Sequence, residues 1–105
     1  MLKKLTVLAV GWGLSWSALA ADVATLTKQA EKGDVNAQMN LADYYADKKD
    51  YINEYIWEKR LANQGYAIYQ YNLAQMYRKG QGVNQNYATA FQWYQKSANQ
   101  GYASA

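Results

Sequence analysis

The chain of 105 residues contains no cysteine, no histidine and no proline. Without histidine a Ser-His-Asp triad is impossible, and without histidine and cysteine the usual ligands of zinc and copper are missing. The lack of cysteine also excludes disulfide bonds. No segment alternates apolar and polar residues for long, so strands are not expected. These absences favour an all-α protein that needs no metal and no other cofactor.

The first twenty residues have the composition of a secretory signal peptide. Lys3 and Lys4 precede a long apolar run, and the small-residue motif Ala-Leu-Ala ends at Ala20, where cleavage is expected. The run is too short for a stable membrane span, although a retained N-terminal anchor helix is the alternative interpretation. The sequence therefore predicts a mature domain of residues 21–105 that is periplasmic or secreted and does not contact a membrane.

The basic character of the chain belongs largely to this leader. The whole sequence has a formal net charge of +3, and removal of Lys3 and Lys4 leaves nine basic and eight acidic residues. A nearly neutral domain lacks the dense positive charge of nucleic-acid-binding proteins. The charge thus argues against a nucleic-acid partner.

The rest of the chain contains an internal repeat. Residues 33–45 align with residues 65–77 at a shift of 32, and residues 51–65 align with residues 87–101 at a shift of 36. A repeat of this length is one helix–turn–helix unit, which cannot bury its apolar face alone. The pattern predicts a single repeat domain made of a half-repeat, a shortened repeat, a full repeat and the start of a truncated repeat: 21–32, 33–64, 65–100 and 101–105.

Apolar spacing and capping residues predict five helices within this domain. Asp34, Asp50 and Asn86 stand where side chains can accept hydrogen bonds from the first turn of a helix. Leucines and tyrosines at helical spacing follow each of them, and glycines mark the ends. The expected helices cover residues 22–32, with Asp22 as the cap, then about 34–46, 50–64, 66–79 and 87–100.

The order of these residues resembles the Sel-1-like repeat, a relative of the tetratricopeptide repeat. The resemblance covers nearly the whole mature chain and is most complete in the second unit. It implies an α/α superhelix, or solenoid, of antiparallel helix pairs that acts as a non-catalytic adaptor or scaffold. The first unit departs from the pattern, because it lacks the G-x-G-V turn. The matching positions are Gly65, Ala67, Gln70, Leu73, Tyr77, Gly80, Gly82, Val83, Tyr87, Ala90, Trp93, Tyr94, Lys96, Ala98, Gln100 and Gly101.

Several carboxylates stand one helical turn apart, and they are the main candidates for chemistry. Paired carboxylates can transfer protons or bind calcium, but no loop has the ligand density of a calcium site. Basic residues flank them, which favours a solvated acidic face. A hydrolase acting on the cell wall or on β-lactams remains a third hypothesis. Its candidate residues are Asp43, Asp47, Asp50, Glu54 and Glu58.

The better candidates for function lie on the first helix of each unit. In tetratricopeptide-like arrays this helix lines the concave surface, and Asn40 and Asn72 occupy equivalent positions on it. An asparagine can donate and accept at once, so it can hold a peptide amide. A solvated or interhelical asparagine is the alternative. The predicted face for a protein or peptide partner consists of Asn36, Asn40, Asp43, Ile68, Asn72 and Gln75.

The sequence leaves the role of the domain open between two kinds of binding protein. A scaffold binds several ligands, whereas a small exported inhibitor or immunity-type protein binds one toxin or enzyme tightly. The last residues, 101–105, repeat the opening of a unit, which leaves open a truncated chain, fraying, or a helix supplied by a partner. An uncovered final helix would expose Phe91 and Tyr94 and favour self-association.

Overall fold

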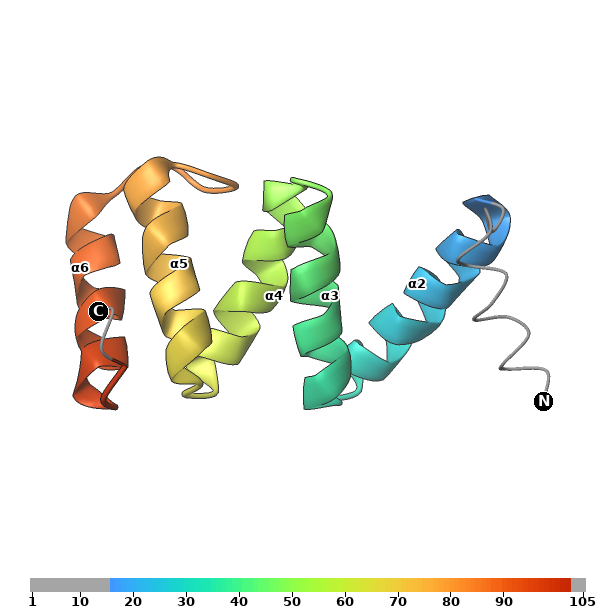
Figure 1. Cartoon of the computed structure of the whole chain (residues 1–105), viewed down its shortest axis with the longest axis horizontal. Helices are drawn as coiled ribbons and strands as arrows, with labels where there is room; N and C mark the ends of the chain where they lie inside the picture. The colour runs from blue at the N-terminus through green and yellow to red at the C-terminus, as the bar shows by residue number, and fades with distance from the viewer. Residues whose placement is uncertain (1–15, 103–105) are drawn as a thin grey trace.

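The computed structural model describes residues 16–102, which form a row of antiparallel helices (Figure 1). Within that range no residue belongs to a strand. This confirms the all-α prediction. The helices are α2 (Trp16–Glu31), α3 (Val35–Asp47), α4 (Tyr51–Asn63), α5 (Ala67–Lys79) and α6 (Tyr87–Asn99).

Side-chain caps fix the start of three helices, as the sequence predicts. Asp34, Asp50 and Asn86 accept hydrogen bonds from backbone N–H groups three residues later, at 3.2, 3.3 and 3.0 Å. Each cap satisfies one of the donors that a helix N-terminus leaves free. Local sequence therefore defines where α3, α4 and α6 begin.

The first helix starts earlier than the sequence predicts. It begins at Trp16 and not near Asp22, so Asp22 lies inside α2 and does not cap it. Residues 16–21, Trp-Ser-Ala-Leu-Ala-Ala, are rich in alanine and contain no glycine or proline, so no residue between Trp16 and Asp22 interrupts the helix. Most of the predicted signal peptide, residues 1–15, lies outside the described residues.

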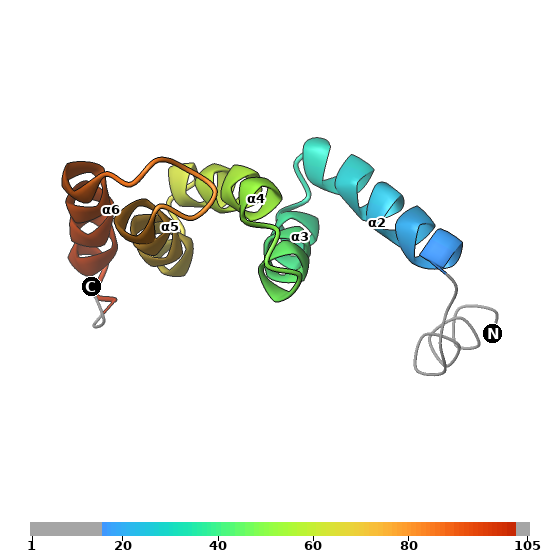
Figure 2. The ribbon, with the colours of Figure 1, turned by 90° about the horizontal axis from the view of Figure 1, so that it is seen from above.

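The helices stack into an elongated array. The main contacts join consecutive helices, and the molecule measures 47 × 24 × 24 Å. Seen from above, α4 is displaced to one side of the line that joins α3 and α5 (Figure 2). Each helix thus contacts mainly its neighbours, which is the arrangement expected for a repeat array.

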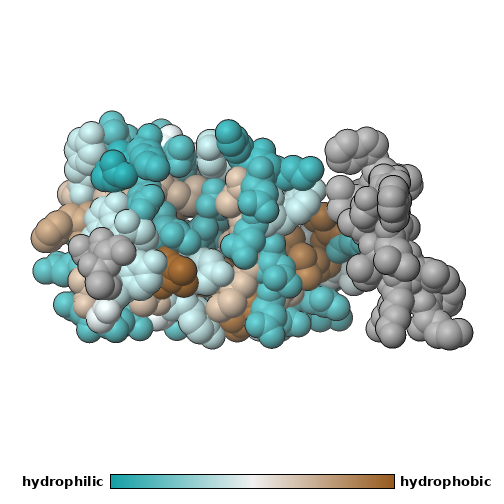
Figure 3. Space-filling model, in the orientation of Figure 1, coloured by the Kyte–Doolittle hydropathy of each residue, from teal (hydrophilic) through white to brown (hydrophobic). Residues whose placement is uncertain are grey.

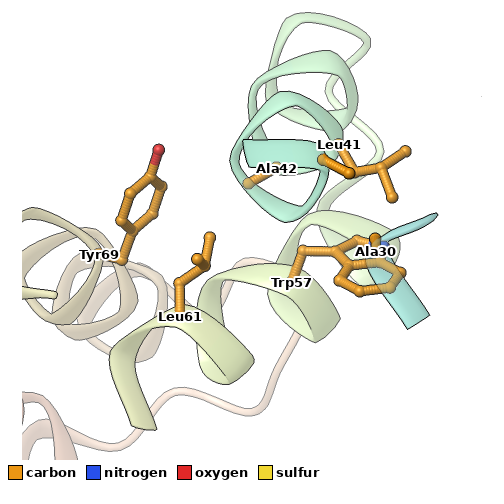
Figure 4. Packing of buried hydrophobic residues seen from close by; sticks show 7 residues of the cluster. Ala30, Leu41, Ala42, Trp57, Leu61 and Tyr69 are labelled. Atoms are coloured by element: carbon orange, nitrogen blue, oxygen red, sulfur yellow. The ribbon is translucent and has the colours of Figure 1, made fainter. Parts of the chain in front are cut away.

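The core is built from small and branched residues with a few large rings. Ala30, Leu41 and Leu61 are fully buried. Trp57 is also buried, and its ring lies between α4, α3 and the end of α2 (Figure 4). On the other side of α4, Tyr69 lies beside Leu61. Alanines allow the helices to approach closely, and the rings fill the remaining volume.

A pair of glutamine bonds is repeated in both units. Gln38 donates to the buried carbonyl of Ala30 at 3.0 Å, and Gln64 donates to the Gln38 side-chain oxygen at 2.7 Å. Gln70 and Gln100 make the equivalent bonds in the second unit, at 3.2 and 2.8 Å. These bonds join three successive helices and satisfy polar groups that would be costly to bury unpaired.

The two units differ in the turn between their helices. The second has a long loop, in which Gly82 adopts φ 74° and a Cβ atom would lie 2.2 Å from the carbonyl oxygen of Tyr51. Only glycine fits this contact between the loop and the start of α4. The first unit has a tight connection in which Lys49 adopts φ 58°.

Candidate binding surface

The predicted partner face is divided between α3 and α5. On α3, Asn36, Asn40 and Asp43 are exposed. On α5, Ile68 is exposed, whereas Asn72 and Gln75 are half-buried. The array places these residues on the first helix of each unit, as expected, and leaves most of them accessible.

The two equivalent asparagines lie in different surroundings. Asn40 is exposed, but Asn72 is half-buried and its side chain hydrogen-bonds to Glu58. The alternative of an interhelical asparagine therefore describes Asn72, whereas Asn40 is solvated. Asp43 acts electrostatically on the same glutamate from α3. The structure thus brings two of the six predicted residues, Asp43 and Asn72, to one place beside Glu58.

The prediction of a solvated acidic face is wrong for two of the five carboxylates. Glu54 and Glu58 are only 9% and 2% exposed, and they lie one turn apart on α4. Their helical positions turn them toward the neighbouring helices, while Asp43 and Asp47 on α3 stay exposed. Glu58 Oε1 is buried without a hydrogen-bond partner among the described residues.

Burial changes the charge state of this pair. Desolvation, then the hydrogen bond and charge of Glu54, raise the pKa of Glu58 to about 9, against a weaker opposing effect of Asn72. Burial also raises the pKa of Glu54, while the bond to Glu58 lowers it. The directions indicate that Glu58 is the protonated donor and Glu54 the acceptor. Within the part of the chain that the structure describes, no lysine or arginine contributes to either pKa.

The same region perturbs its neighbours. Burial and the charge of Asp47 raise the pKa of Asp43. Burial, followed by the charges of Asp43 and Glu58, raises the pKa of Tyr69 on α5. Negative charge from α3 and α4 thus reaches α5. Perturbed carboxyls of this kind are typical of functional sites, although structural networks produce them too.

A comparison of the two units would have identified Glu54 and Glu58 from the sequence. At the shift of 36, they align with Ala90 and Tyr94. The second unit fills these positions with a small and an aromatic residue, which indicates that both are inward-facing. The charges along α4 alone predicted a solvated surface, because Lys59 and Arg60 directly follow Glu58 in the sequence.

The second unit has an aromatic cluster around Tyr94, the residue that aligns with Glu58. Tyr71 lies 5.4 Å from the Tyr94 ring and 5.2 Å from the Tyr102 ring, measured between centroids. Arg78 donates to the Tyr94 hydroxyl at 3.2 Å. This contact with a side chain of α6 gives Arg78 a partner within the protein.

The outer side of α6 carries exposed rings. Tyr87 and Phe91 are 66% and 62% exposed. Their equivalents in α4, Tyr51 and Tyr55, are half-buried, and the Tyr55 hydroxyl hydrogen-bonds to Tyr77 of α5 at 2.8 Å. The predicted exposure is confirmed for Phe91. Tyr94 is half-buried, because it packs on Tyr71.

The remaining surface is mostly hydrophilic. In the view of Figure 3, strongly apolar residues form separate spots and no continuous band. Across residues 16–102, no helix has the length and apolar character to cross a membrane. The same residues hold no group of three or more acidic side chains arranged for a metal ion.

Comparisons with known proteins agree with this architecture, which defines the chain as an all-α helical repeat protein. Residues 67–102 match the Sel1 repeat family model. A crystal structure of a protective antigen present in uropathogenic Escherichia coli strains, which displays an SLR fold, superposes with a TM-score of 0.67 at 30% sequence identity. That comparison covers 78% of this chain and 18% of the antigen. No curated protein sequence matches the chain.

Residues 67–102 thus form a Sel1 repeat, and the helix array as a whole has an SLR-type fold. Repeats of this family generally mediate protein–protein interaction. The chain spans less than a fifth of the length of the antigen. The likeness therefore establishes the repeat and its fold.

Proposed function

We propose that this chain is a non-catalytic protein–protein interaction module, exported to the periplasm or secreted, that acts as an adaptor or scaffold. The family and the fold support the interaction role. The composition of residues 1–20 supports export. The observation that carries the proposal is the accessible face of α3 and α5, where polar side chains and the exposed Ile68 stand on the first helix of each unit.

Capture of a partner with matched variants tests this function. The full chain would be immobilised and exposed to periplasmic extract and to culture medium. The variant Asn40→Ala/Asp43→Ala should lose the captured protein, because both side chains are exposed on the proposed face. The control Gln92→Ala/Gln95→Ala, on exposed positions of α6, should retain it. Equal capture by both variants would place the interaction elsewhere or show it to be non-specific.

The stoichiometry of the captured complex separates the scaffold from the alternative. An exported inhibitor or immunity-type protein would form a tight one-to-one complex with a single enzyme or toxin and abolish its activity. A scaffold would bind more than one protein and leave their activities intact. Light scattering of the purified complex, with an activity assay of the captured protein, distinguishes these outcomes.

A further inference from the structure

The buried carboxyl pair on α4 is not needed to build the fold. At the equivalent positions the second unit has Ala90 and Tyr94, and it forms the same helix pair. Burying two carboxyls in place of apolar side chains lowers stability, because each loses its hydration. Departures from local rules of this kind are expected where a protein binds something. The pair therefore calls for a role beyond packing.

Among residues 16–102, no lysine or arginine acts on either carboxyl of the pair. Glu58 Oε1 has no hydrogen-bond partner among residues 16–102. The two basic residues that follow Glu58 on α4 point to aromatic rings, with Lys59 5.6 Å from the Tyr55 ring and Arg60 4.8 Å from the Trp57 ring. The groups that face Glu58 are acidic or neutral. They are Glu54 on its own helix, Asp43 on α3, and Asn72 and Tyr69 on α5.

The pair adjoins the proposed partner face. Asp43 and Asn72 belong to that face, one on each first helix, and both act on Glu58. Asp43 is exposed, Glu54 is 9% exposed and Glu58 is 2% exposed. Exposure thus falls from Asp43 at the surface to Glu58 in the interior. The negative charge of the carboxyls is complementary to a basic side chain.

We propose that Glu54 and Glu58, with Asp43 and Asn72 at the entrance, form a receptor site for a lysine or arginine side chain of the partner protein. In the free protein, Glu58 keeps its proton and donates a hydrogen bond to Glu54. When the cation binds, Glu58 releases that proton to solvent and becomes a carboxylate that pairs with the ammonium or guanidinium group. Each basic side chain bound near neutral pH therefore releases up to one proton. Charge-assisted hydrogen bonds of this kind are strong when water is excluded.

This inference specifies the ligand of the proposed interaction face, and small probes test it without the partner. N-acetyl-arginine amide and N-acetyl-lysine amide would be titrated into the full chain, with neutral N-acetyl-citrulline amide as the control. Backbone amide resonances of α3, α4 and α5 near the pair would report binding. Probe concentrations up to about 50 mM would reveal a Kd of ~10 mM, the weak range expected for a single side chain.

The expected result is saturable binding of at least one basic probe, with proton uptake by the buffer and no response to citrulline amide. The variant Glu54→Gln/Glu58→Gln should lose this binding at least tenfold and release no proton. The variant Asp22→Asn/Glu31→Gln replaces two carboxyls at exposed positions of α2 and should bind as the unmodified chain does. Circular dichroism would establish that both variants fold.

Three results would overturn the site: no saturable binding of either basic probe, equal binding of citrulline amide, or unchanged binding by the folded double glutamine variant. The two proposals fail separately. Probe binding without any protein captured on the α3–α5 face would leave the receptor site and remove the proposed function. Specific capture of a protein with no response to either basic probe would do the reverse.

Discussion

The first repeat unit, α3 and α4, and the second, α5 and α6, share a backbone plan but differ in what fills the space around their second helix. Both have the paired glutamine bonds. The first unit buries Glu54 and Glu58 where the second has Ala90 and Tyr94. The shared features specify the fold, so the differences show where one unit has been adapted. The clearest of these differences is the buried pair of Glu54 and Glu58.

The largest effect is expected at Leu61 in α4, which aligns with Ser97 in α6; both side chains are fully buried. Leu61→Ala should lower the free energy of unfolding by about 3–4 kcal/mol, because it removes apolar area and leaves a cavity. Ser97→Ala removes only the hydrogen bond to the Ala67 carbonyl and should cost about 1 kcal/mol. Urea unfolding measures both. Equal losses would mean that the two units contribute similarly to stability despite their different cores.

The next effect is a pH dependence that belongs to the first unit. The pKa of Glu58 is raised from 4.5 to about 9 in the folded protein, so between these values the folded state binds a proton that the unfolded state has lost. Stability from this group is full below pH 4.5 and declines as the pH rises to about 9. We expect a loss on the order of 2–3 kcal/mol, less than the full shift implies, because Glu54 shares the proton.

The variant Glu58→Gln isolates this titration. Glutamine has nearly the same size as glutamate but does not ionise. The stability of the variant should therefore change less than that of the unmodified chain between about pH 5 and pH 9, the range between the unfolded and folded pKa of Glu58. The control Glu31→Gln removes an exposed carboxyl and should leave the pH profile unaltered. Parallel profiles for the unmodified chain and Glu58→Gln would show that Glu58 is already ionised at neutral pH.

The glutamine bonds should have a smaller and equal effect in both units. Gln38→Ala and Gln70→Ala each leave a buried backbone carbonyl, of Ala30 or Ala62, without its side-chain donor. A loss of about 1–2 kcal/mol is expected for each. Thermal unfolding of the two variants tests whether the equivalent bonds contribute equally to the stability of the two units. A loss confined to one unit would show that water replaces the bond in the other.

The sequence predicts the shared plan better than the differences. Caps, glycine positions and the internal alignment locate four of the five helices to within one or two residues, because these signals are local. The start of α2 was missed, since alanine-rich sequence permits a helix without a capping residue. The burial of Glu54 and Glu58 was missed because it depends on helices brought together by packing. Only the alignment of the two units, read residue by residue, reveals it.

The smallest effect on stability is expected at the end of the array, where α6 differs from α4 in being uncovered. Phe91 is 62% exposed, so Phe91→Glu removes little buried area and should change the free energy of unfolding by less than about 0.5 kcal/mol. Exposed rings favour contact between copies, so this variant should weaken concentration-dependent self-association. Sedimentation velocity at several concentrations measures it, with Gln92→Glu as the control of equal charge. If the unmodified chain is already monomeric at high concentration, the rings of α6 do not drive assembly, and the two units differ at the acidic pair but not in how they contact other molecules.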